Sequence, residues 1–186
     1  MYLERNNTES SANLGDHLSS VSNISSDASN LERINRWSCA IRMFEDKPFF
    51  GYGPATYMFN YAPYQLKANR TIISTNSANR GNAHSEYLGP LAESGLLGLL
   101  SFLILMVTIL YTGIHAYSRT NDKRLKTLLM SSLLGLITYF IHGTMNNFLD
   151  TDKLSVPFWG FTAIIVAIDI HTRKVLVQEA LPEKKA

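Results

Sequence analysis

A histidine and two glutamates lie just ahead of a long apolar run, and their types suit them to carry chemistry. His84, Glu86 and Glu93 precede residues 96–117, a run without any Asp, Glu, Lys or Arg. Because an imidazole exchanges protons near neutral pH, His84 is the candidate general base. Glu86 and Glu93 are candidates for orienting that base or binding an acceptor. The alternative is that both glutamates lie in the solvent layer.

Cationic side chains collect on the N-terminal side of His84. Residues 31–80 hold seven Lys and Arg against three Asp and Glu. Arginine binds phosphate groups through forked, charge-assisted hydrogen bonds, so we expect an anion site here. For each arginine taken singly, solvated loop charge is the competing interpretation. The candidate substrate-binding cations are Arg33, Arg36, Arg70 and Arg80.

A base, several arginines and an adjoining lipid-facing wall together fit group transfer from a lipid diphosphate donor. The diphosphate is already a good leaving group, so such a site needs charge stabilisation and a base more than a metal ion. The single cysteine, Cys39, and the lack of a Cys/His cluster or Asp-rich motif predict no metal and no cofactor. The formal net charge of +2 is too weak to predict a nucleic-acid partner.

One amphipathic helix is predicted in the polar half of the chain. Ser29 and Glu32 have the spacing of a capping box, and Pro48 stops the helix. Its apolar face consists of Ile34, Trp37, Ile41 and Phe44, and arginines occupy its other faces. Such a helix suits a membrane interface or the lid of a polar chamber, or equally a surface helix packed on a small core. A second, short helix kinked at Pro90 is expected after His84.

Three apolar segments, residues 96–117, 125–141 and 154–170, predict transmembrane helices. The loop after the first segment and the C-terminal tail are rich in Lys and Arg, whereas the 142–153 turn holds only Lys153. The positive-inside rule therefore places the loop and the tail in the cytoplasm. His84 and the 142–153 turn are then expected to share the outer face.

The predicted fold class is an all-α membrane protein with a polar periplasmic loop region. We expect a flexible loop segment at 1–29, a loop region with the amphipathic helix and the His-bearing entrance helix at 30–95, three transmembrane helices at 96–170, and a cytoplasmic tail at 171–186. The first residues lack the basic and apolar blocks of a signal peptide. Earlier transmembrane helices, from a longer polypeptide or a separate one, are therefore expected to precede the periplasmic region.

Three short motifs resemble the C-terminal half of the O-antigen ligase and O-antigen polymerase family. They are Arg-x-x-x-Trp (Arg33, Trp37), Pro-x-x-Gly-x-Gly (Pro48, Gly51, Gly53) and His…Glu-x-Gly (His84, Glu93, Gly95). The resemblance implies a multi-pass glycosyltransferase of the bacterial inner membrane. Such enzymes move a glycan from undecaprenyl diphosphate, on the periplasmic side, to lipid A core, to another glycan or to protein.

The resemblance also assigns roles to individual residues. His84 matches an essential loop histidine and Arg33 an arginine of the donor site, with Arg36 within reach of the same motif. Full members of the family carry more spanning helices than the three expected here, so the chain is expected to be the C-terminal part of a metal-independent, inverting transferase. Two alternatives stay open: a non-catalytic membrane interaction module whose arginines attract anionic headgroups, and an inactive truncated remnant.

Overall fold

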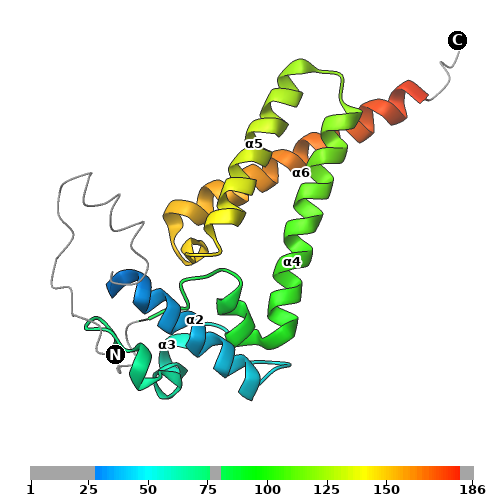
Figure 1. Ribbon diagram of the computed structural model, residues 1–186. Coiled ribbons are helices and arrows are strands. Elements are labelled where there is room, and N and C mark those ends of the chain that lie inside the picture. Colours follow the sequence, from blue (N-terminus) through cyan, green and yellow to red (C-terminus); the bar gives the residue numbers. More distant parts are fainter. Residues whose placement is uncertain (1–27, 76–80, 181–186) are drawn as a thin grey trace, which may run out of the picture. The chain divides into compact units, whose positions relative to one another are not determined.

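The computed structural model describes residues 28–75 and 81–180, and every regular element in those ranges is a helix (Figure 1). The predicted all-α class is therefore confirmed. Arg80 and nearly all of the predicted loop segment 1–29 lie outside the described residues. The elements are α2 (Ala28–Asp46), α3 (Tyr57–Asn60), η1 (Ala62–Tyr64), η2 (Lys67–Asn69), α4 (Leu88–Arg119), α5 (Lys123–His142), η3 (Phe148–Asp150) and α6 (Asp152–Ala180).

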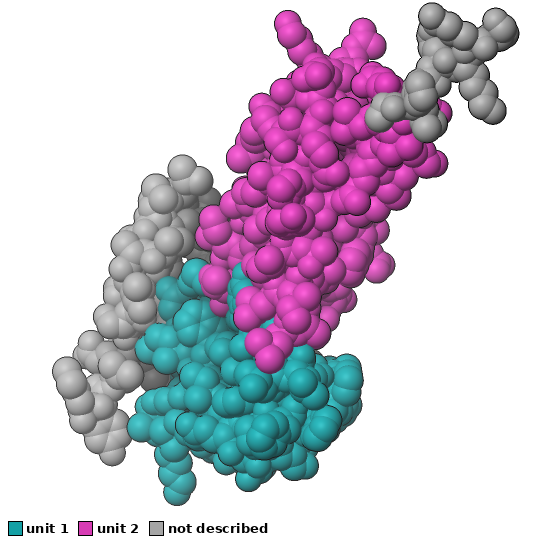
Figure 2. Space-filling model, turned by 90° about the vertical axis from the view of Figure 1, so that its right-hand side faces the viewer, with its two compact units in different colours: residues 1–99, 145–147 teal, residues 100–144, 148–186 magenta. Residues whose placement is uncertain are grey.

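The chain divides into two compact units, which Figure 2 colours separately. The first unit comprises residues 1–99 and 145–147, and the second comprises residues 100–144 and 148–186. The division falls inside α4, close to the point where the sequence changes from polar to apolar. Each unit has its own hydrophobic core.

Helix α2 buries a different face from the one that its apolar residues mark. It ends at Asp46, as Pro48 predicts, and it already includes Ala28, one residue before the predicted cap. Its buried residues are Glu32, Asn35, Arg36, Cys39, Ala40 and Met43. Ile34 and Ile41 of the apolar stripe remain 41% and 45% exposed. Helix α2 therefore packs on a small core, but through Cys39, Ala40 and Met43 and not through its apolar stripe. Partners from residues 57–75 satisfy the polar groups that are buried with them.

Tyrosines build much of the core of the first unit. Tyr57 and Tyr61, one helical turn apart, stack with their ring centroids 5.4 Å apart. The Tyr57 hydroxyl donates to the carbonyl of Arg36 at 2.7 Å, and the Tyr61 hydroxyl donates to the carbonyl of Thr75 at 2.6 Å. These bonds satisfy phenol groups that burial would otherwise leave without water. The core consists of Cys39, Ala40, Met43, Tyr57, Tyr61, Ala83 and Ala92.

Two glycine-containing segments of the first unit pack backbone against backbone. The N–H of Leu96 donates to the Pro48 carbonyl at 2.7 Å, and the N–H of Gly53 donates to the Glu93 carbonyl at 2.7 Å. A methyl group added at Gly51 would lie 2.4 Å from the carbonyl carbon of Glu93. Since Gly51 also has a φ of 63°, only glycine permits this approach. We call this contact between residues 48–53 and 92–96 the glycine joint.

Helix α4 bends at Gly95, where the backbone angles are non-helical (φ 65°, ψ -156°), and Figure 1 shows the bend near the start of the helix. The predicted kink at Pro90 is wrong. Pro90 lies in the first turn of α4, where a missing backbone N–H removes no helical hydrogen bond. Residues 96–119 then run as one helix of about 36 Å, which is long enough to cross a hydrocarbon core.

The second unit is held together by large apolar side chains from α4, α5 and α6. Its core consists of Ile109, Ala116, Leu129, Leu133, Leu136, Phe140, Phe158, Ile165 and Ile168. Gly113 of α4 and Gly135 of α5 allow close packing, because a methyl group there would lie 2.6 Å from Leu133 and 2.8 Å from Phe161. The helices of this unit therefore approach one another where a side chain is missing.

Ion pairs join the end of α4 to the C-terminal part of α6 in the second unit. Arg119 at the end of α4 binds Asp169 of α6 at 2.7 Å, and Arg173 binds the same carboxylate at 2.8 Å. Asp122 caps α5 by accepting from the backbone N–H groups of Arg124 and Leu125. The loop between α4 and α5 and the C-terminal part of α6 thus lie at the same end of this unit.

In the part of the chain that the structure describes, three helices are long and apolar enough to cross a membrane: residues 88–119, 123–142 and 152–179. Their number and positions confirm the three predicted spanning segments, on length and composition. Helix α6 extends to Ala180, well beyond the predicted end of the third segment at residue 170 and into the predicted tail. The apolar run of α4 has a mean hydropathy of 2.3.

Candidate active site

Three of the predicted site residues come together in the first unit. The indole N–H of Trp37 donates to the backbone carbonyl of His84 at 3.2 Å, joining residues 47 positions apart. Arg33 and Arg36 belong to the same helix as Trp37, and their charges act on the His84 ring. Folding therefore brings the candidate base next to two of the candidate anion-binding residues.

His84 has a backbone conformation that is uncommon for a residue with a side chain. Its φ of 48° lies in the left-handed region. Its backbone N–H donates to the side-chain oxygen of Asn82 at 3.1 Å, while its carbonyl accepts from Trp37. These two bonds hold the histidine peptide from both sides, and the residue itself is half-buried. Such strained positions collect at functional sites.

The surroundings of His84 lower the pKa of its imidazole. Burial removes water from the charged ring, and the positive charges of Arg36 and Arg33 add repulsion, which Glu32 partly offsets. A lowered pKa keeps the ring neutral at neutral pH. The neutral imidazole is the form that accepts a proton, so the site favours the base over the acid form of His84.

Arg36 is a buried and internally paired charge, so the competing interpretation of a solvated charge is wrong for this arginine. It is 4% exposed. Its Nε donates to Glu32 Oε1 at 2.6 Å, and its guanidinium lies 4.1 Å from the centroid of the Tyr61 ring. A methyl group at Gly81 would lie 1.6 Å from Nη1 of Arg36. The adjacent carboxylate is what makes burial of this charge tolerable.

Glu32, which the sequence analysis did not select as a site residue, organises the polar cluster around Arg36. Its carboxylate accepts from the hydroxyl of Ser74 and, at 3.0 Å, from that of Thr71. Burial alone would raise the pKa of Glu32, but the hydrogen bonds from Ser74 and Arg36 outweigh it and lower the pKa. The spacing of four residues between Glu32 and Arg36 is the sequence signal that could have revealed the pair.

Of Arg33 and Arg36, only Arg36 forms an ion pair among the described residues. It is half-buried, and its Nη1 donates to Asn30 Oδ1 at 3.3 Å, a local bond at the start of α2. None of the ion pairs found within residues 28–75 and 81–180 includes Arg33. Its charge therefore acts beside His84 without a carboxylate partner of its own among those pairs.

The two candidate glutamates have different surroundings. Both carboxylate oxygens of Glu93 accept from backbone N–H groups, those of Ala55 and Tyr57, each at 2.9 Å. Glu93 therefore holds the start of α3. Glu86 is 6% exposed, so its expected alternative place in the solvent layer is wrong.

Two predicted arginines and two residues close to His84 complete the description of the site. Arg70 is exposed, and Arg80 falls outside the described ranges. Ser85, adjacent to His84, is buried, and its hydroxyl accepts from the backbone N–H groups of Tyr87 and Leu88 at 3.3 Å. It acts as a cap for α4. Asn82, which the sequence analysis passed over, could have been found from its position two residues before His84, where Asn commonly forms a local turn.

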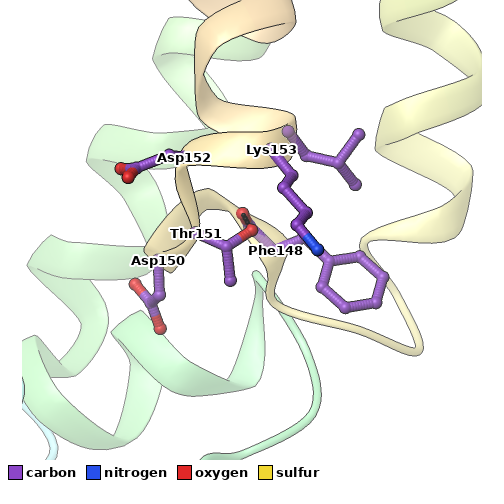
Figure 3. A pocket seen from close by; sticks show the side chains of 6 residues that line it. Phe148, Asp150, Thr151, Asp152 and Lys153 are labelled. Carbon is purple, nitrogen blue, oxygen red and sulfur yellow. Dashed lines mark hydrogen bonds between the residues drawn. The ribbon is translucent and has the colours of Figure 1, made fainter.

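A separate hollow of about 680 Å³ lies in the second unit at the start of α6 (Figure 3). Phe148, Asp150, Thr151, Asp152, Lys153 and Leu154 line it. In Figure 3 the carboxylates of Asp150 and Asp152 lie on one side of the turn, and the Lys153 side chain extends toward Phe148 on the other. The hollow contains none of the predicted site residues. Within the described ranges, no three His, Cys, Asp or Glu side chains gather in a way that could hold a metal ion.

Comparison with known proteins gives the family. An uncharacterized protein of Haemophilus influenzae (strain ATCC 51907 / DSM 11121 / KW20 / Rd) is 22% identical over 117 residues, which cover 63% of this chain. The match covers 28% of that protein, so the chain spans little more than a quarter of the length of this curated relative. No solved structure matches the chain. The family model for O-antigen ligase matches residues 3–103, more than half of the 186 residues, and the chain therefore belongs to the O-antigen ligase family.

Proposed function

We propose that the first unit supplies the base and part of the donor site of a glycosyltransferase of the bacterial inner membrane. The donor is a glycan linked to undecaprenyl diphosphate, and the acceptor is a hydroxyl group of lipid A core, of another glycan or of a protein. One arrangement carries the proposal: Trp37 of α2 donates to the His84 carbonyl at 3.2 Å, and burial together with the charges of Arg36 and Arg33 on the same helix lowers the pKa of the His84 ring. A neutral base thus lies within the field of two cations that suit a diphosphate.

The proposed reaction is a single displacement with inversion. His84 takes the proton of the acceptor hydroxyl as the acceptor oxygen forms a bond to the anomeric carbon. The bond from that carbon to the diphosphate oxygen breaks at the same time, and the electron pair stays on the diphosphate. Fixed positive charge near the leaving oxygen lowers the barrier, because it stabilises charge that develops in the transition state.

Arg33 and Arg36 have different proposed roles. Arg33 is the proposed donor ligand, because its guanidinium is half-buried and lies outside the ion pairs found among the described residues. Arg36 is proposed to act by its charge and by supporting the histidine loop, since Glu32 and Tyr61 already hold it. Arg70, which is exposed, adds to the positive field that attracts an anionic donor.

The proposed orientation places the first unit on the periplasmic side. The end of α4 and the C-terminal part of α6, joined through Asp169, are then cytoplasmic. The 142–153 turn holds only one Lys or Arg, Lys153, which supports the expectation that this turn lies on the same side of the membrane as His84.

The test is glycan transfer in membranes that contain the whole polypeptide to which this chain belongs, with a labelled undecaprenyl-diphosphate glycan as donor. His84→Gln should reduce transfer roughly 100- to 10,000-fold, the usual range for loss of a general base, while donor binding persists. Arg33→Gln should weaken donor binding strongly, and Arg70→Gln, which removes only an exposed charge from the general positive field, should weaken it less.

Two results would contradict the proposal. Transfer that survives His84→Gln would remove the histidine from its role as base. Equal binding of the labelled donor and of plain anionic lipid, with both reduced alike by Arg33→Gln, would instead favour a non-catalytic membrane interaction module.

A further inference from the structure

Two adjacent phenylalanines are the most exposed large apolar side chains among the described residues of the first unit. Phe49 is 67% exposed and Phe50 is 77% exposed, in the turn that follows α2. Single apolar residues on a surface need no explanation, but two aromatic neighbours on one tight turn present a continuous apolar surface to their surroundings. The turn therefore raises the question whether water, protein or lipid covers these two side chains.

The turn is held firmly in place by the glycine joint. The Pro48 carbonyl, directly before the two phenylalanines, accepts from the N–H of Leu96 at 2.7 Å. Gly51, directly after them, donates its N–H to the Lys47 carbonyl at 3.1 Å. A methyl group at Gly95 would lie 2.5 Å from the carbonyl carbon of Phe49, so the two backbones touch. The position of the turn along α4 is therefore fixed.

The turn contacts α4 at Leu96, the first residue of the apolar run. Leu96 begins the uncharged segment that the family and the length of α4 mark as a membrane span, and Leu96 and Leu97 are themselves 40% and 55% exposed. The exposed phenylalanines thus continue the apolar surface of the span at its polar end. Just before them, the ammonium of Lys47 lies 4.2 Å from the centroid of the Tyr52 ring. A cation beside aromatic side chains is typical of the level of lipid headgroups.

We propose that the Phe49–Phe50 turn inserts into the boundary between lipid headgroups and acyl chains, next to the point where α4 enters the bilayer. The occupant of this surface is lipid, because the surface is continuous with that of a membrane span and is joined to it by backbone hydrogen bonds. The turn then fixes the depth at which the first residues of the span lie. Burial of two phenylalanine rings in an apolar environment favours this placement.

Fluorescence quenching by lipids tests the insertion. Phe50→Cys and, as an independent neighbour, Phe49→Cys are labelled with an environment-sensitive NBD dye in the full chain, reconstituted in phosphatidylcholine vesicles. The native Cys39 stays unlabelled, because it is completely buried and burial raises the pKa of its thiol to about 11. Circular dichroism confirms that helix content is unchanged.

Ile73→Cys is the matched control. Ile73 is an exposed apolar residue, 48% accessible, between Thr71 and Ser74. Those two residues contact Glu32, near the opposite end of α2, about 20 Å from Asp46 at the helical rise per residue. The label at position 73 therefore reports on the first unit away from the glycine joint.

The expected result is a blue-shifted emission at positions 49 and 50, quenched severalfold more strongly by lipid doxyl-labelled near the headgroup than the emission at position 73. Water-like emission at positions 49 and 50 would overturn the proposal. A blue-shifted emission that no doxyl lipid quenches would overturn it as well, since the turn would then be covered by protein. Equal quenching at position 73 would show that the turn has no special contact with lipid.

Discussion

The glycine joint predicts that one added methyl group, at Gly95, destabilises the first unit. Gly95→Ala adds a Cβ where the Phe49 carbonyl carbon lies only 2.5 Å away, within the backbone of the opposing segment. The Phe49 carbonyl belongs to a turn that is itself hydrogen-bonded to α4, so it has little freedom to retreat. Gly89→Ala is the control in the same helix, since its added methyl would lie 3.9 Å from the Ala83 methyl, an ordinary contact.

The loss of unfolding free energy expected for Gly95→Ala is the sum of two contributions. The backbone angles of Gly95, φ 65° and ψ -156°, belong to a region that is essentially reserved for glycine, and holding alanine there costs about 1–3 kcal/mol. Relief of the contact with Phe49 also separates the N–H of Leu96 from the Pro48 carbonyl, and loss of that bond costs about 1 kcal/mol. We therefore expect Gly95→Ala to lower the free energy of unfolding of the first unit by about 3 kcal/mol.

Urea titration of the chain in detergent micelles measures this loss. Trp37, whose indole N–H is bonded to the His84 carbonyl, reports unfolding of the first unit, and Trp159→Phe removes the second tryptophan. Gly89→Ala should change the free energy of unfolding by less than about 1 kcal/mol, because alanine suits a helix better than glycine does. If Gly95→Ala and Gly89→Ala unfold at the same urea concentration, the backbone contact does not stabilise the unit and the reasoning is refuted.

Three further predictions concern the candidate site. Arg33→Gln removes a positive charge that lowers the pKa of His84, so the acid limb of the transfer rate should move to higher pH, whereas Arg70→Gln should leave the limb in place. Because the folded-state pKa of His84 lies below its ordinary value of 6.5, the unfolded chain binds a proton that the folded chain does not. The stability contributed by His84 is then complete above that value and is lost as the pH falls toward the lowered pKa. Urea titrations between about pH 8 and pH 5.5 should therefore show a smaller slope in His84→Gln, and an unchanged slope would assign the pH dependence to other groups. Glu93→Gln leaves one backbone N–H of residues 55–57 without its charged acceptor and should cost about 1–2 kcal/mol in the same assay, a value that Glu45→Gln, at an exposed glutamate of α2, would not reproduce if the cap is the cause.

Several features of the fold and of the site could be predicted from the sequence because they depend on neighbouring residues. The uncharged run that begins at Leu96 marks a span by composition alone, and Pro48 ends α2 because it cannot continue a helix. His84 and the arginines could be selected as candidates from residue type and order. Their proximity could not be derived, since the bond from Trp37 to His84 joins positions 47 residues apart.

The predicted kink of α4 is at the wrong residue for a similar reason. Proline signals a break by its own chemistry, but Pro90 lies in the first turn, where that chemistry has no effect. Helix α4 bends at Gly95, where the backbone of the turn after α2 packs so closely that no Cβ would fit. A single glycine in a sequence does not reveal that another backbone segment lies beside it.

The sequence by itself determined where this chain is apolar, where its helices stop and which residue types are available for chemistry, because these are properties of consecutive positions. Only the tertiary structure decided which face of α2 is buried. The apolar stripe with Ile34 and Ile41 would be expected inside, yet Arg36 and Glu32 are buried in its place. A charged side chain can be buried only when partners satisfy it, and these partners, Ser74 among them, come from segments far along the chain.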